Sequence, residues 1–268
     1  MNLFWIALAA AVLCSAIGFK YYIWFISIGY GLSIAGIGIV FLAAAFTGMG
    51  GAAAGAGLFA VCAMLVVYGL RLAGYLAVRE FRSTYNQKMQ GEIKDGKLIP
   101  MPAKIAMWIT VALLYACQTA PAGFRIANGK GTDVFVIIGL LLMICGVILE
   151  AAADLQKAEA KKKDPGRFVD TGLYRFVRCP NYLGELILWT GVFITGIGSN
   201  TGAVQWLIAL AGYIGIIYVM FSGARRLEMR QNRTYGDDEE YQVYVRCVPI
   251  MIPFIPLYSV EKHKWLVA

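Results

Sequence analysis

Long apolar runs alternate with short polar segments along most of the chain. Runs of about 20 residues occupy positions 3–19, 23–46, 57–78, 105–124, 133–153, 182–198 and 203–222. A helix needs about 20 apolar residues to cross the hydrocarbon core of a bilayer. The pattern therefore predicts an all-α, polytopic membrane helix bundle with about seven transmembrane helices. Because no basic residue precedes the first run, we expect an uncleaved helix there and not a signal peptide.

The basic residues fall on one side of the predicted membrane. Of the 268 residues, 59% are hydrophobic, and the mean hydropathy is +0.65. Seven crossings place 21 of the 24 lysines and arginines on the side that contains Lys20 and the chain's last residues. Positive loops mark the cytoplasmic side. The sequence thus predicts an N-terminus outside and a C-terminus in the cytosol, in a bacterial inner membrane or an endoplasmic reticulum.

The net charge of +8 raises the question of a nucleic-acid partner. Its confinement to membrane-flanking segments favours anionic lipid headgroups or a phosphorylated cofactor instead, so we expect no nucleic acid. Six scattered cysteines without a CxxC pair and a single histidine, His263, argue against a metal site and against Ser–His or Cys–His catalysis.

The Gly/Ala run at residues 48–57 has two readings. A glycine-rich loop can cradle phosphate, and small residues also allow close helix packing. The run lies on the predicted outer side with no strand before it, which favours packing.

Two polar segments flank the last two predicted spans. Residues 154–181 begin as a charged continuation of the fifth span, and Asp164–Pro165–Gly166 should end that helix. Pro180 suits the start of the next helix. Residues 225–249 carry apolar and tyrosine positions at helical spacing, so we expect a cytosolic helical extension that folds back on residues 154–181.

Ionisable residues at membrane depth are candidates for function because burying them is costly. Arg71 and Tyr75 share one face of the third predicted helix. Arg71 either snorkels to the surface or sets the electrostatics of Tyr75, which would donate a proton or hydrogen bond to a buried carbonyl. Glu150 and Asp154 share a face of the fifth helix, where they either form salt bridges with the basic loop or line a site.

Asn181, Tyr182 and Glu185 lie in the first turn of the sixth predicted helix. Free N–H groups and the positive dipole end can hold an anion there, with Arg175 and Arg178 close by in sequence. The alternative is that Asn181 caps the helix and Glu185 compensates its dipole.

The stretch GLYRFVRCPNYLGELILWTGVF (172–193) resembles the C-terminal domain of the membrane steroid 5α-reductase family. The tail from Arg225 to Pro256 and the R-x-x-x-Y of residues 71–75 are similar to that family as well. About 120 residues match well. The resemblance divides the chain into N-terminal membrane helices with a cytosolic loop (1–104) and a reductase-like membrane domain with cytosolic cofactor loops (105–268), which together form one integrated domain.

The resemblance implies an NADPH-dependent reduction of an activated C=C bond in a lipid-soluble, steroid-like substrate. It implies that Tyr75 polarises the 3-oxo group of an enone. It also implies an NADPH site formed by Asp154, Asn181, Tyr182, Glu185, Arg225, Arg226 and Tyr241. The charge pattern of the sequence adds Glu150, Arg175 and Arg178 to this site.

One departure affects the substrate more than the chemistry. Relatives pair the tyrosine with an earlier glutamate, yet residues 1–79 contain no Asp or Glu, so Tyr75 would act alone or with Gln118 or Arg71. Two other hypotheses remain. One is a methyltransferase that uses S-adenosylmethionine, which Glu239–Glu240 keeps open, and the other is a non-catalytic sterol-binding membrane protein.

Overall fold

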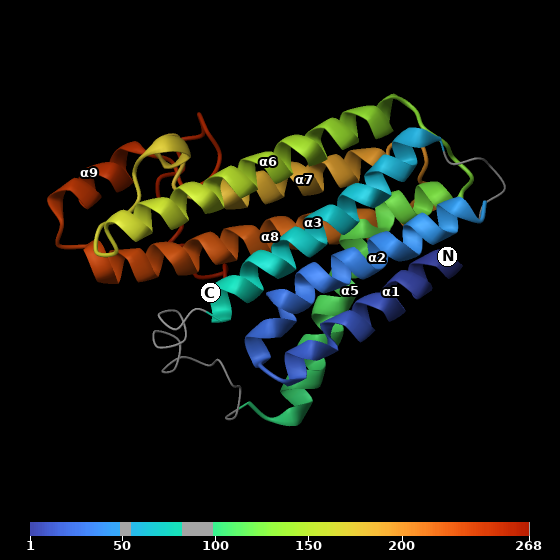
Figure 1. Cartoon of the computed structure of the whole chain (residues 1–268), viewed down its shortest axis with the longest axis horizontal. Helices are drawn as coiled ribbons and strands as arrows, with labels where there is room; N and C mark the ends of the chain where they lie inside the picture. Colours follow the sequence, from blue (N-terminus) through green and yellow to red (C-terminus); the bar gives the residue numbers. More distant parts are fainter. Residues whose placement is uncertain (49–54, 82–98, 268) are drawn as a thin grey trace. The chain divides into compact units, whose positions relative to one another are not determined.

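The structure, a computed structural model, describes residues 1–48, 55–81 and 99–267. Most of the Gly/Ala run and most of the polar loop after Arg79 lie outside these residues. The described part of the chain is helical and contains no strand (Figure 1). The predicted all-α membrane fold is confirmed, whereas the predicted direction of the helices across the membrane stays a prediction.

The helices follow the predicted apolar runs closely. They are α1 (Asn2–Ser15), α2 (Ile28–Phe46), α3 (Ala56–Phe81), α5 (Met101–Ala127), α6 (Val134–Lys163), α7 (Pro180–Thr195), α8 (Gly202–Tyr235) and α9 (Glu239–Cys247), with short 3-10 turns at Ala16–Phe19, Tyr22–Phe25 and Gly172–Arg175.

Within the part of the chain that the structure describes, six segments are long and apolar enough to cross a membrane: 2–19, 22–46, 56–80, 101–127, 134–163 and 202–235. The predicted sixth span corresponds to α7, which has only 16 residues. At 1.5 Å per residue it is about 24 Å long, less than the hydrocarbon thickness. Along α6 the exposed side chains of Ile137, Leu141, Ile148 and Leu155 share one face. Such a continuous apolar stripe is typical of a lipid-facing helix.

The predicted helix ends are correct around residues 154–181. Helix α6 ends at Lys163, directly before Asp164–Pro165–Gly166, and α7 begins at Pro180. The polar tail is helical, as predicted, because α8 continues to Tyr235 and α9 follows. Asp238 caps α9 by accepting hydrogen bonds from the backbone N–H groups of Glu240 and Tyr241.

The described chain divides into two compact units that interleave along the sequence. Unit 1 contains residues 1–141 and 191–213, and unit 2 contains residues 142–190 and 214–268. These bounds follow packing, whereas the division at residue 104 followed sequence resemblance and stays a prediction.

In unit 1, α2 and α3 pack closely through small residues. A methyl group added to Gly31 would lie 2.6 Å from the backbone of Gly69 and Ala73, so only glycine permits this approach. At the start of α2, the buried Glu80 of α3 accepts hydrogen bonds from the Trp24 indole and from the Ser27 hydroxyl. This carboxylate fixes the end of α3 against the turn before α2.

At the other end of unit 1, a buried arginine joins α5 to two loops. Arg125, which is 1% exposed, donates hydrogen bonds to the carbonyls of Thr195, Gly131 and Ile197, and it pairs with Asp133 at 2.7 Å. Burial works to raise the pKa of Asp133, but hydrogen bonds from Arg125 and backbone N–H groups outweigh burial and hold this pKa below its usual value.

In unit 2, α6 and α7 pack closely through a second pair of glycines. A methyl group added to Gly184 would lie 2.7 Å from the backbone of both Gly146 and Glu150. The α6 carboxylates therefore lie beside the first turns of α7.

Candidate functional site

The loop before α7 and the polar tail lie together in unit 2, as predicted. The backbone N–H groups of Arg178 and Cys179 donate to the carbonyls of Pro249 and Ile250, each at 2.9 Å. The Tyr244 hydroxyl donates to the Tyr174 carbonyl at 2.7 Å. These bonds join segments about 70 residues apart and hold the tail over the start of α7.

A buried ion pair strengthens this junction. Arg178 donates to Glu228 of α8 at 2.9 Å, and the two side chains are 1% and 0% exposed. Glu228 also accepts the backbone N–H of Val260 at 2.8 Å, and Arg178 donates to the Tyr258 carbonyl. We call Arg178, Glu228 and the Val260 N–H the tail clamp.

Two other predicted cofactor residues contribute to the same junction. Arg225 donates to the carbonyls of Glu261 (2.9 Å) and Leu266 (3.1 Å). The Tyr241 hydroxyl donates to Asn232 at 2.7 Å, and its ring packs against Phe168. Burial raises the pKa of Tyr241 to about 12, so this phenol stays protonated at neutral pH.

The first turn of α7 has unsatisfied polar groups around it. Asn181 Oδ1, Ser222 Oγ of α8, and Nε and Nη1 of Arg178 are buried and have no hydrogen-bond partner in the described part of unit 2. The end of the Tyr182 side chain lies against Gly223, next to Ser222. Buried polar groups normally find partners, so this turn is a candidate ligand site.

The remaining predicted cofactor residues are either buried acidic residues or exposed arginines. Glu150, Asp154 and Glu185 are buried, the first two on α6 and the third on α7. Arg175 and Arg226 are exposed on the same unit. The described residues contain no group of three or more His, Cys, Asp or Glu side chains that could hold a metal ion.

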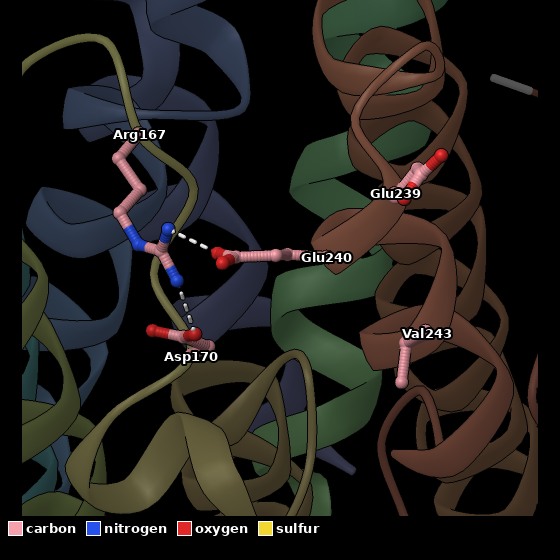
Figure 2. Close-up of a pocket in the computed structure, with 5 residues that line it drawn as sticks. All are labelled: Arg167, Asp170, Glu239, Glu240 and Val243. Atoms are coloured by element: carbon pink, nitrogen blue, oxygen red, sulfur yellow. Dashed lines mark hydrogen bonds and ion pairs between the residues drawn. The ribbon is translucent and has the colours of Figure 1, made fainter.

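An open pocket of about 490 Å³ lies near the tail, but it has the wrong charge for phosphate (Figure 2). Its lining is Arg167, Asp170, Glu239, Glu240 and Val243, which includes none of the predicted cofactor residues. Arg167 pairs with Glu240 at 2.5 Å and with Asp170 at 3.0 Å, whereas the Glu239 side chain points away from Arg167. Three carboxylates and one guanidinium give a formal charge of −2, which disfavours an anion.

Arg71 and Tyr75 lie on α3 in unit 1, and both are half-buried. Arg71 is ten residues before the end of α3, about 15 Å along the helix axis, and so lies deeper than a residue near the helix end. Tyr68 is on the same face of α3, and its hydroxyl donates to the Tyr30 hydroxyl at 3.3 Å. The predicted catalytic pair thus belongs to a face that carries a further buried phenol.

A family model described as "Protein of unknown function (DUF1295)" matches residues 31–248. The chain belongs to the DUF1295 family. A steroid 5α-reductase, DET2 of Gossypium hirsutum, is 25% identical to this member over 122 residues. The match covers 44% of this chain and 42% of that protein. The resemblance to steroid 5α-reductases is therefore confirmed at the level of family, and no solved structure matches.

The structure also shows polar residues in this DUF1295 member that the sequence pattern did not single out. Glu228 lies among the arginines of residues 225–233, and its partner Arg178 is 50 residues away in sequence. Glu80 is the first acidic residue of the chain, and its position at the end of a long apolar run was the one available signal.

Proposed function

We propose that this protein is an NADPH-dependent reductase of an activated C=C bond in a lipid-soluble substrate, such as a 3-oxo-Δ4 steroid. The observation that carries the proposal is the first turn of α7, where unsatisfied buried groups lie next to the junction of loop and tail. The similarity to a steroid 5α-reductase over 122 residues supports the same conclusion.

The groups at this turn suit a dinucleotide. Arg178 offers unused N–H donors, Asn181 Oδ1 is an acceptor, and Ser222 can act as either. The exposed Arg175 and Arg226 add positive charge for phosphates, and Glu150, Asp154, Tyr182 and Glu185 would complete the site. When bound, NADPH supplies the hydride.

Three predicted cofactor residues would act by positioning. The tail is already held in place by Arg225, by Tyr241 and by the Nη2 group of Arg178, which is paired with Glu228. Their contribution is a fixed cover over α7, since a site that excludes water strengthens every electrostatic interaction inside it.

The substrate would meet Tyr75 in unit 1. A protonated phenol can donate a hydrogen bond to the enone carbonyl, and Arg71 one turn away favours the negative charge that develops on that oxygen. Solvent would supply the last proton.

One observation favours a second candidate, a methyltransferase. The acidic pocket at Glu239 and Glu240 suits a cationic ligand such as the sulfonium of S-adenosylmethionine. Because Glu240 is already paired with Arg167, the net attraction of this pocket for a cation is reduced.

Thermal unfolding of the purified protein in detergent distinguishes these candidates. We expect NADPH to raise the unfolding temperature in a saturable manner, and Asn181→Ala to weaken that binding about tenfold by removing a buried acceptor. Gln242→Ala, an exposed change on α9, is the control and should leave NADPH binding unchanged. Stabilisation by S-adenosylmethionine and not by NADPH would support the methyltransferase, and no response to either would support a non-catalytic protein.

A further inference from the structure

Gln118 is an exception among the buried polar residues of unit 1. It lies on α5 within a membrane-spanning segment and is 3% exposed. Both Oε1 and Nε2 are buried and have no hydrogen-bond partner among residues 1–48, 55–81 and 99–267. An amide that gives up water without gaining a partner destabilises the protein.

Several other buried polar side chains among the described residues of this unit are satisfied. Gln205, a second buried glutamine, exchanges hydrogen bonds with Asn128 and accepts the backbone N–H of Thr201 at 2.7 Å. Arg125 and Glu80 have the partners described above. The Asn200 amide of this unit also has no partner among the described residues, but Asn200 is half-buried in the loop between α7 and α8. Gln118 is fully buried within a membrane-spanning segment, so its unused amide requires a separate explanation.

A group of phenols begins one helical turn from Gln118. Tyr115 is one turn earlier on the same face of α5, and its ring lies 4.9 Å from that of Tyr30. Tyr30 in turn accepts the hydrogen bond of Tyr68, which shares its helix face with Arg71 and Tyr75. Gln118 thus lies one helical turn from a group of phenols that extends to the α3 face of the predicted catalytic residues.

We propose that the Gln118 amide binds the carbonyl oxygen of a lipid-soluble ligand inside unit 1. The Nε2 group has two N–H donors and a ketone oxygen is an acceptor, so the ligand would supply the partner that the chain does not. Because α5 crosses the membrane here, the ligand class is an apolar molecule with a carbonyl group. This inference rests on the proposed function, which it deepens by making Gln118 a substrate-binding residue.

The proposal predicts opposite effects on stability and on binding. Gln118→Met keeps the length of the side chain and removes the amide. Without ligand, the variant should unfold at a higher temperature, by about 2–4 °C, because an unsatisfied group has been removed. Its affinity for cholest-4-en-3-one should fall about tenfold or more, because the carbonyl then loses its donor.

Two controls isolate the amide–carbonyl contact. Gln205→Met removes a satisfied glutamine of the same unit, so it should lower the unfolding temperature and leave sterol affinity unchanged. Cholest-4-ene lacks the oxygen, so its affinity should be the same for the natural chain and for Gln118→Met. Equilibrium binding of the two tritiated sterols to protein in detergent gives both ratios.

Three results would overturn the proposal. They are a loss of stability in Gln118→Met like that in Gln205→Met, an unchanged affinity of this variant for cholest-4-en-3-one, and a failure of the natural chain to prefer the ketone over cholest-4-ene. The NADPH response of the same preparation separates this failure from failure of the proposed function. If NADPH still binds and supports reduction, only the role of Gln118 is wrong.

Discussion

Glu228→Gln keeps the size of the side chain and should weaken the attachment of the tail in unit 2. The substitution leaves the Arg178 guanidinium buried without its counter-ion, at a site where the two side chains are 1% and 0% exposed. Removing one partner of a buried ion pair costs about 3–5 kcal/mol. Because the glutamine Oε1 still accepts one of the two hydrogen bonds, we expect the lower end, about 3 kcal/mol.

The Val260 amide reports this weakening directly, since it donates to Glu228 at 2.8 Å. A loss of about 3 kcal/mol corresponds to a roughly 100-fold faster exchange of this amide with solvent deuterium. Hydrogen-exchange mass spectrometry of the peptide that contains Val260 measures the effect.

A matched control is Glu240→Gln, which breaks the exposed pair with Arg167. Solvent screens that pair, so exchange at Val260 should not change. The double variant Arg178→Met/Glu228→Gln removes both charges but keeps a side-chain acceptor for the Val260 N–H, so it should recover most of the protection. Equal protection in Glu228→Gln and in the natural chain would refute the role of the clamp.

Three further predictions concern packing, acid stability and catalysis. Gly184→Ala should destabilise unit 2 by about 1–3 kcal/mol because backbone atoms lie 2.7 Å from the new methyl group, whereas Gly74→Ala, with nothing within 4 Å, should be neutral or stabilising. Thermal unfolding compares the two variants, and equal effects would contradict the packing argument. The pKa of Asp133 is lowered, so the stability that its carboxylate contributes is present above the ordinary carboxyl pKa of about 4 and is lost as the pH falls through the lowered value. Asp133→Asn should therefore lose less stability in acid than the natural chain, and an equal loss in both would contradict this pH dependence. Tyr75→Phe should keep NADPH binding and lower turnover by roughly 100-fold or more, and an unchanged rate with an enone substrate would remove this phenol from the mechanism.

Local patterns were sufficient to predict the helices. Apolar runs of membrane length, the break at Asp164–Pro165–Gly166 and the start at Pro180 act over a few residues. The end of α6 at Lys163 and the start of α7 at Pro180 confirm the last two. The short α7 was harder to predict, because its apolar run continues to residue 198 while the helix ends at Thr195.

The polar partners could not be predicted, because they depend on long-range pairing. Arg178 has the neighbours of a cofactor residue in sequence, yet its partner Glu228 comes from another helix. Arg125 directly follows the predicted span 105–124, where the sequence indicates only a loop charge, yet it is buried among three carbonyls and a carboxylate. Gln118 drew attention as a possible partner of Tyr75, but only three-dimensional packing reveals that its amide is unsatisfied.

Transfer of deuterium from labelled cofactor tests the central claim most directly. Purified protein is incubated with cholest-4-en-3-one and NADPH that carries deuterium at the transferable C4 position, in ordinary water, and the products are read by mass. Hydride transfer from NADPH should give a saturated ketone that contains one deuterium. A reduced product without deuterium, or an unreduced sterol after incubation with a preparation that binds NADPH, would contradict it.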